Sequence, residues 1–397
     1  MSLVWAARHD RWVKAVPSWL RVALAMFGVG WGANQFSSLL LVYRDHDGLP
    51  TTVVTLLFGA YAIGLVPALL VAAAFSDRLG RRRIMRPVVI LAAVASVVLL
   101  VAGGNVAALT VGRLLAGVAS GAAFGPGTAW VKELSTDAGP GAGARRAAVA
   151  LSAGFGGGPL VAGAVAQWAP LPTVVPYLVH IALMAVIVPL VWRVRETVPT
   201  TVQGDRRADV RSALRHREFR FRVGPAAPLV FGAATASFAV LPGLVRLHGL
   251  GPVVGGAVAG LTLGTGVLVQ PIARLLDRRR PGWTYVVGMA LAVAGFLLAA
   301  TTAFTGAPLL LVPSAIVLGG CYGMLLVAGL NTVEELAAPD DLATVTAVFY
   351  CLTYVGFVTP YVVTATRAAV PPTALFVFAA AVAAVVLVVA RLAARHS

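Results

Sequence analysis

The sequence predicts an all-α membrane protein of twelve transmembrane helices, arranged as two pseudo-symmetric halves of six helices each. The composition, the long apolar runs and a polar segment midway along the chain all point to this fold. Of the 397 residues, 59% are hydrophobic and 12% are charged, whereas a soluble domain has about 25% charged residues. A soluble fold cannot bury that much apolar surface, so we expect part of it to face lipid.

The apolar runs are long enough to cross a bilayer as helices, because one helical span needs about 20 apolar residues. Each run is continuous, without the alternation of a transmembrane β-barrel strand. The predicted spans are residues 20–43, 51–75, 84–103, 106–131, 146–168, 173–193, 223–243, 252–275, 283–302, 307–333, 343–366 and 370–390. A charged segment precedes the first span, which we expect to be an uncleaved signal anchor.

Lys and Arg residues gather in every second loop. The exceptions among the 31 are Arg44, Arg246 and Arg367, and Arg113 inside a predicted helix. Because loops rich in Lys and Arg stay in the cytoplasm, we expect a multi-pass protein of the cytoplasmic (plasma, or cell inner) membrane with both termini inside. This topology also accounts for the net charge of +16, so we expect no nucleic-acid partner.

The longest polar segment divides six spans from six spans. We therefore predict an N-terminal half (1–194), a basic cytoplasmic linker (195–222) with a surface helix around 210–221, and a C-terminal half (223–397). Asp77-Arg78 and Asp277-Arg278 lie 200 residues apart, each after the second span of its half, which indicates an internal duplication. Transporters often place the substrate site between such repeats, near the middle of the membrane.

The loop after the second span reads AAFSDRLGRRR over residues 73–83. It resembles the signature loop of the major facilitator superfamily, G-x-x-x-D-R-x-G-R-R, with Ala73 in place of the first glycine. The resemblance assigns gating to Asp77, Arg78, Gly80, Arg81 and Arg82. A carboxylate–guanidinium pair at the membrane interface can form in one state and break in another. The positive-inside rule alone would explain the arginines, but not Asp77 or Gly80. The second copy, residues 273–280, is degenerate.

Three further segments strengthen the resemblance. Residues 112–121, GRLLAGVASG, are similar to R-x-x-Q-G; a charge inside a membrane helix is usually functional, although Arg113 could instead reach the headgroups. Residues 154–163, GFGGGPLVAG, resemble G-x-x-x-G-P-x-x-G-G of drug:proton antiporter-type exporters, which implies efflux; close helix packing alone is the alternative. The motif residues there are Gly154, Gly158, Pro159 and Gly163. Residues 196–199, ETVP, resemble a frequent family ending.

In this family, helices 1, 4, 7 and 10 line a central cavity. The polar residues on these and neighbouring helices are the candidate substrate ligands: Asn34, Gln35, Arg113, His180, Ser237, Tyr322 and Tyr354. Asn34 and Gln35 point about 100° apart on a helix, so they cannot both face the cavity squarely. His180 is equally compatible with a hydrogen-bonded packing role.

No acidic residue lies near the middle of a predicted span. Exporters of cationic drugs commonly keep a carboxylate there, so we predict a neutral or anionic substrate and leave proton coupling open. Glu334 and Glu335 fall in a predicted inner loop without Lys or Arg. We predict that they pair with the basic linker as a second part of the inner gate, with a solvated loop as the alternative.

Together these observations predict a monomeric secondary transporter that exports a small organic molecule by alternating access. An importer or facilitator of the same family is the main alternative. We do not expect an ATP-driven pump, because neither Lys14 nor Lys132 follows glycine, as the phosphate-binding loop requires. We find no cofactor or metal motif. A membrane enzyme or a non-transporting receptor has less support, since no nucleophile, base and metal ligands converge.

Overall fold

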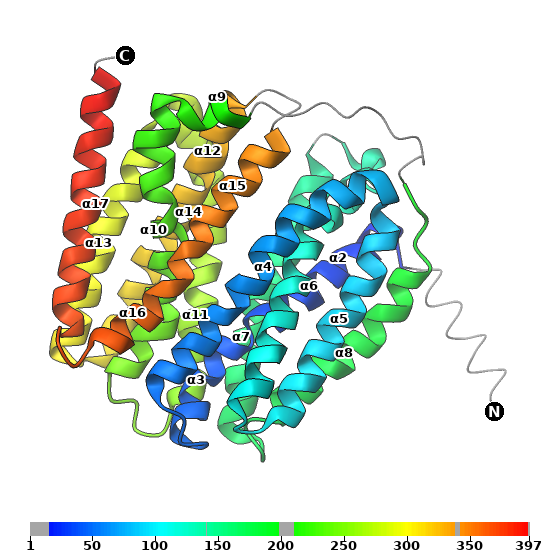
Figure 1. The fold of residues 1–397 in the computed structure, drawn as a ribbon, viewed down its shortest axis with the longest axis horizontal. Coiled ribbons are helices and arrows are strands. Elements are labelled where there is room, and N and C mark those ends of the chain that lie inside the picture. Colours follow the sequence, from blue (N-terminus) through cyan, green and yellow to red (C-terminus); the bar gives the residue numbers. More distant parts are fainter. Residues whose placement is uncertain (1–15, 140, 198–209, 338–341, 396–397) are drawn as a thin grey trace.

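The computed structural model describes residues 16–139, 141–197, 210–337 and 342–395, and this part of the chain is helical throughout apart from its connecting turns. Two helical bundles lie side by side (Figure 1). The N-terminal half comprises α2 (Ser18–Asn34), α3 (Phe36–Asp45), α4 (Thr51–Leu79), α5 (Arg81–Ala102), α6 (Val106–Glu133), α7 (Ala142–Trp168) and α8 (Val175–Trp192). The C-terminal half comprises α10 (Gly224–Thr235), α11 (Gly251–Leu268), α12 (Gln270–Arg279), α13 (Trp283–Thr305), α14 (Leu311–Leu336), α15 (Leu342–Tyr354), α16 (Thr359–Thr366) and α17 (Pro372–Arg395).

Eleven helical stretches in the described residues are long and apolar enough to cross a membrane. They correspond to the second to twelfth predicted spans. The first predicted span differs, because its regular helix is interrupted at one residue, Gln35, which separates α2 from α3 while keeping helical φ and ψ angles of −55° and −29°. Hydrophobicity is continuous across this break, so the sequence pattern alone did not reveal it.

Two spans of the C-terminal half are also interrupted. After α10 the chain forms a π-helical segment, Ala236–Val240, and then a 3-10 turn, Leu241–Leu244. A 3-10 turn, Val355–Val358, separates α15 from α16. Such local departures from α-helix are frequent at functional positions. The linker helix is shorter than predicted: α9 covers Val210–Arg215, and the next helical segment, Phe219–Val223, leads directly into α10.

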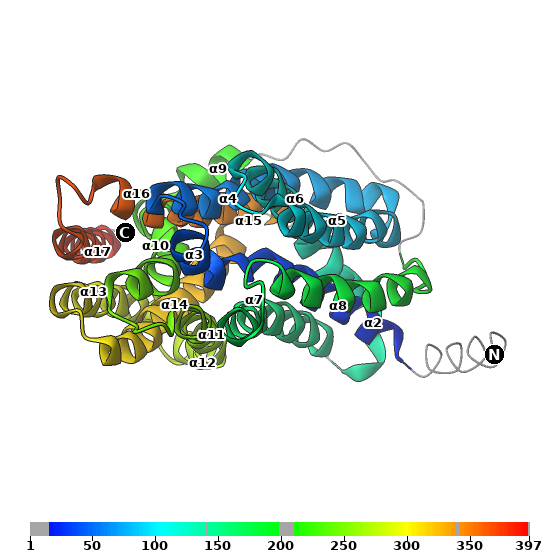
Figure 2. The same cartoon turned by 90° about the horizontal axis from the view of Figure 1, so that it is seen from below.

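The two halves approach each other at one end of the molecule and separate towards the other (Figure 1). We call the end with α9 the linker side and the end with α3 and α16 the far side. Helices α7 and α11 pack together between the halves (Figure 2). Their contact involves Gly163 and Gly256, where a Cβ on either glycine would collide with a backbone carbonyl of the other helix. Since α7 ends and α11 begins near these glycines, the contact belongs to the far side.

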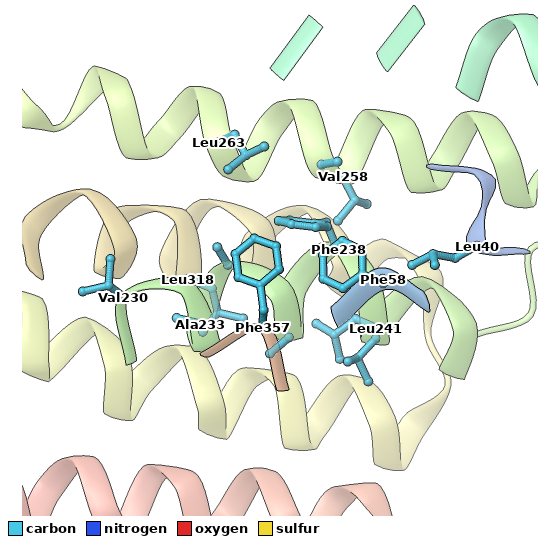
Figure 3. Packing of buried hydrophobic residues seen from close by; sticks show 14 of the residues in the cluster. Leu40, Phe58, Val230, Ala233, Phe238, Leu241, Val258, Leu263, Leu318 and Phe357 are labelled. Carbon is cyan, nitrogen blue, oxygen red and sulfur yellow. The ribbon is translucent and has the colours of Figure 1, made fainter. Parts of the chain in front are cut away.

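The largest cluster of buried apolar side chains also joins the halves. It contains Phe36 and Phe58 from the N-terminal half together with Phe238 and Phe357 from the C-terminal half. Figure 3 shows Phe58 beside Phe238 and Phe357. A second cluster, around Met26, lies within the N-terminal half. Apolar burial therefore links the halves across the middle and far side of the molecule.

Candidate functional site

Arg113 lies inside the N-terminal half, with none of its surface exposed. Its guanidinium donates to three backbone carbonyls: Nη1 to Ala33 at 3.0 Å, Nη2 to Phe58 at 3.1 Å and Nε to Leu57 at 3.3 Å. The ring of Phe36 lies 4.7 Å from its Cζ atom. All three nitrogens are thus engaged within the protein. The prediction that Arg113 binds substrate stays a prediction, and this geometry favours a structural role.

The glycines of α6 explain how Arg113 reaches these carbonyls. A Cβ on Gly117 would collide with the carbonyl of Tyr61, and one on Gly121 would collide with the carbonyl of Leu65. Small residues allow two membrane helices to approach this closely. Because α4 and α6 pack backbone to backbone, the side chain of Arg113 lies directly over the α4 carbonyls.

The break in the first span is stabilised by side chains. The carbonyl of Ala33 accepts from Arg113, that of Asn34 from Ser37 Oγ at 2.8 Å, and that of Gln35 from Ser38 Oγ at 3.0 Å. A broken membrane helix needs such partners because lipid cannot hydrogen-bond to freed backbone groups. Arg113 therefore holds the junction of α2 and α3 against α4.

His180 belongs to a buried chain of hydrogen bonds in the same half. Its Nε2 lies 2.9 Å from the carbonyl of Gly28, and its Nδ1 lies 2.8 Å from Ser96 Oγ. Because the carbonyl can only accept, Nε2 donates and Nδ1 accepts from the Ser96 hydroxyl. Ser96 in turn accepts from Gln35 Nε2 at 3.1 Å. The geometry of Gln35 and His180 is that of packing residues, and their predicted contact with substrate is untested.

Asn34 and Gln35 point in different directions, as neighbouring residues on a helix must: Gln35 faces Ser96 of α5, whereas Asn34 faces α7. The Nδ2 of Asn34 donates to the carbonyl of Phe155 at 3.1 Å, which joins α2 to α7. In the C-terminal half, Ser237 bonds Thr262 at 2.8 Å between their hydroxyls and joins the π-helical segment to α11. Both candidates are buried, and their assignment as substrate ligands also remains a prediction.

Tyr322 and Tyr354 belong to a group of rings at the junction of the halves. This aromatic cluster comprises Phe58, Tyr61, Phe231, Phe238, Tyr322, Tyr354 and Phe357. Phe231 lies 4.7 Å from Tyr354 and 5.6 Å from Tyr322 between ring centroids. Four helical spans contribute to the cluster, so a sequence pattern within any one of them could not reveal it.

The rings of the aromatic cluster change in exposure along the membrane axis. Phe58 stacks on Phe357 at 5.2 Å, and both rings are buried between the halves. Tyr322 and Phe231, nearer the linker side, are half-buried, as is Tyr350 one turn before Tyr354. The far end of the cluster therefore closes the junction, while its linker end borders the region where the halves separate.

The tyrosine hydroxyls at the linker end are unpartnered. In the described part of the chain, those of Tyr322, Tyr350 and Tyr354 form no hydrogen bond. By contrast, Tyr43 and Tyr177 in the N-terminal half bond each other at 2.9 Å. A hydroxyl can both donate and accept, so these three groups are available to a ligand. Tyr322 and Tyr354 were predicted ligands. Tyr350 was not predicted, although its position one turn before Tyr354 was the available signal.

The signature loop forms a compact network within the N-terminal half. Arg81 pairs with Glu133 at 3.1 Å and donates to Ser76 Oγ at 2.9 Å. The carboxylate of Glu196 accepts from the backbone N–H groups of Arg81 at 2.9 Å and Arg82 at 3.0 Å, and so caps α5. The side chain of Asp77, predicted to form part of the gate, lies outside the described residues.

Gly80 permits the sharp turn into α5, because its φ of +95° would strain any residue with a Cβ. Glu133 and Glu196 were not among the predicted gate residues. The ETVP ending at residues 196–199 was the signal for Glu196. The next residue, Thr197, bonds Glu133 through its hydroxyl, so both acidic residues belong to one network. Acidic side chains from the ends of α6 and α8 thus hold the loop between α4 and α5.

The C-terminal half has a related arrangement. Asp277 accepts from the Gly282 N–H and from Asn331 Nδ2, each at 3.0 Å. Glu334 and Glu335 lie at the end of α14, exposed, beside a groove of about 700 Å³ that Arg222 also lines. No ion pair joins either glutamate to a linker arginine among the residues the structure describes. Their pairing as a gate stays a prediction.

The glycine motif of α7 faces two neighbours. A Cβ on Gly154 or Gly158 would collide with the backbone of α2, at Phe27 and Trp31 respectively, whereas one on Gly163 would collide with α11. Pro159 lies between these contacts, and its carbonyl borders Gly256 of α11. The motif thus joins α7 to its own half and to the opposite half.

Comparison with known proteins identifies the architecture. The family model described as the Major Facilitator Superfamily matches residues 22–359. None of the curated proteins matches the chain. The chain resembles the solved structure of the nucleoside transporter NupG, with a TM-score of 0.73 and 13% identity over 95% of this chain and 99% of that one. It also resembles a POT family transporter in complex with 5-aminolevulinic acid, with a TM-score of 0.76 and 12% identity over 95% of this chain and 97% of that one. A third similar structure is that of a peptide transporter POT in complex with sulfate, with a TM-score of 0.76 and 14% identity over 98% of each chain. At such identities the likeness shows a shared fold.

Proposed function

The chain belongs to the major facilitator superfamily, and from that membership we propose that this secondary transporter exports a small, neutral and largely apolar organic compound. The aromatic cluster carries the proposal. Its rings offer faces for stacking, and its linker end adds the unpartnered hydroxyls of Tyr322 and Tyr354. Ligand pockets typically combine such apolar surface with a few polar groups that fix orientation.

Charge chemistry supports a neutral substrate over an anionic one. The members of the aromatic cluster carry no charge. Each guanidinium nitrogen of Arg113 already donates to a backbone carbonyl. Moving an ion from water into a site without a partner costs far more than moving a neutral molecule. The anionic alternative of the sequence prediction would require Arg113 to leave its three carbonyls.

The direction of access follows from the orientation we propose. If the positive-inside rule places the linker in the cytoplasm, the halves are closed outside and separated inside. In this state a compound can approach the linker end of the aromatic cluster from the cytoplasm. Alternating access then requires the contact between Gly163 and Gly256 to open and the linker side to close.

Export is favoured by the helix-packing motif of α7, which resembles that of drug:proton antiporter-type exporters. Import is the second candidate, because the titles of the solved structures with the same fold name a nucleoside transporter and a peptide transporter and neither as an exporter. For proton coupling, Glu133 and His180 are the groups to test. Glu133 pairs with Arg81 in this state, and rearrangement of the gate would release it.

The gate on the linker side is part of the same proposal. We place the arginines of the linker opposite Glu334 and Glu335, which are exposed in this state, so that closure brings acidic and basic groups together. Exchanging charges between Glu335 and Arg222 should restore transport that each single variant loses. Absence of rescue would remove these glutamates from the gate.

The decisive experiment is flux in proteoliposomes of determined orientation. Matched neutral, anionic and cationic aromatic compounds should be compared in both directions, with and without a proton gradient. We expect transport of the neutral compound from the linker side to the far side. Transport of only the cationic member would contradict the substrate class, whereas transport in the reverse direction would establish import.

A further inference from the structure

A basic groove lies on the linker side of the N-terminal half, between the beginning of α5 and the end of α8. It measures about 640 Å³, and its lining includes Arg82, Arg83, Arg86, Trp192 and Glu196. We propose that this groove binds the phosphate group of an anionic membrane lipid. The groove is separate from the aromatic cluster, so this site is additional to the proposed substrate site.

Arg82, Arg83 and Arg86 retain free donors, whereas Arg78, which also lines the groove, already has a partner. The carboxylate of Glu196 already accepts from the backbone at Arg81 and Arg82. In the described structure the side chains of Arg82 and Arg83 contact no acceptor, and Nε of Arg86 is buried without a partner. Guanidinium groups bind phosphate oxygens in a bidentate manner. An anion in the groove would complete these unused hydrogen bonds.

An aromatic side chain, Trp192, lines the groove. The Trp192 ring lies 4.9 Å from Arg86 Cζ, and Arg86 also donates to the Trp192 carbonyl. Trp192 keeps 40% of its surface exposed. Tryptophan is enriched at the level of lipid headgroups, which is where the beginning of a transmembrane helix such as α5 should lie.

An apolar track continues from the groove along α5. Ile90, Val94, Val97 and Val101 are all exposed, and their spacing places them on one face of the helix. A soluble phosphate compound would make no use of this face. An acyl chain could lie along it while the phosphate occupies the groove, so the combination favours a lipid.

The other half repeats the arrangement. Trp283 begins α13, and the guanidinium carbons of Arg280 and Arg391 lie 5.1 and 5.9 Å from its ring. A groove of about 230 Å³ lies beside these residues. Helices α13 and α17 occupy the same positions in their half as α5 and α8, at opposite edges of the molecule (Figures 1 and 2). An arginine–tryptophan pair thus recurs at the outer edge of each half.

The test uses the full chain in zwitterionic phosphatidylcholine, into which phosphatidylglycerol is titrated. Bound phosphatidylglycerol is counted by native mass spectrometry, and thermal stability is followed in parallel. The double variant Arg83→Gln/Arg86→Gln removes two charges from the groove. Arg145→Gln/Arg215→Gln removes two exposed charges elsewhere on the linker side. A separate arm adds inorganic phosphate to compete with the lipid.

We expect phosphatidylglycerol to stabilise the parent and the control variant but not the groove variant. An interfacial arginine contributes about a factor of five to binding of anionic lipid, so the apparent Kd should rise roughly 25-fold. Equal binding by all three proteins would overturn the proposal. Displacement of the lipid by inorganic phosphate would overturn the proposal that the bound phosphate group belongs to a lipid, and would indicate a soluble phosphate ligand. If the groove variant does not fold, Trp192→Leu should still weaken binding several-fold, and unchanged binding would overturn the site.

Discussion

Two regions of the molecule, the interior of the N-terminal half around Arg113 and the linker end of the aromatic cluster, use polar side chains in the membrane in opposite ways. In the N-terminal half, Arg113, Gln35 and His180 are buried and bonded to groups of the same half. At the linker end of the aromatic cluster, the hydroxyls of Tyr322 and Tyr354 have no partner in the described residues. A polar residue inside a membrane span is therefore not by itself a ligand. What matters is whether its hydrogen-bonding capacity is already used.

This contrast predicts the largest effect for Arg113→Met. The variant leaves the carbonyls of Ala33, Leu57 and Phe58 without their partner, and unsatisfied buried groups are costly. We expect a loss of about 3–5 kcal/mol, as for breaking a buried charged interaction. Thermal unfolding in detergent measures it, with exposed Arg367→Met as the control. A variant of parental stability that no longer binds substrate would instead make Arg113 a ligand and remove the contrast.

The next effect concerns the contact that joins the halves. Gly256→Val places a side chain against Pro159 and Gly163 of α7, and overpacking costs about 1–3 kcal/mol. Because only the state closed at the far side contains this contact, we expect a population shift towards far-side opening, measured by distances between spin labels on the two halves. Gly264→Val is the matched control in the same helix, since nothing lies within 4 Å of its Cβ position. Equal behaviour of the two variants would show that the contact does not control access.

A smaller loss of stability is expected for His180→Phe. The change removes the hydrogen bonds to Gly28 and Ser96, which should cost about 1–3 kcal/mol. If His180 serves packing alone, transport at a temperature where the variant is folded should keep the parental KM and pH dependence. A lost dependence on the proton gradient would assign His180 to coupling.

The smallest effects on stability should come from the tyrosines. Tyr322→Phe and Tyr354→Phe keep the stacked rings and remove only unpartnered hydroxyls, so we expect unchanged thermal unfolding. If each hydroxyl bonds the substrate, KM should rise about 2- to 13-fold, equivalent to roughly 0.5–1.5 kcal/mol per bond. Tyr361→Phe, on the exposed surface of α16, is the control. Equal KM values for all variants would move the substrate site away from the cluster.

Several features could be predicted because they depend on local sequence. The continuous apolar runs predicted the spans, and the signature-loop motif singled out Gly80, which forms the turn into α5 with a positive φ. The break at Gln35 could not be predicted, because its stabilisation depends on Arg113 from a helix far along the chain. Likewise, the role of Glu196 depends on its position beside the beginning of α5.

The sequence by itself determined the class of protein, its family and every predicted span but the first, because hydrophobicity reflects the surrounding lipid and short motifs reflect the local backbone. Only the tertiary structure decided which polar side chains already have hydrogen-bond partners within the protein and which are available to a ligand. Hydrogen bonds inside a membrane form between distant spans, and their partners are set by how closely helices approach. The glycines of α6 and α7 set that distance, so Arg113 lies on backbone carbonyls, while Tyr322 and Tyr354 keep free hydroxyls.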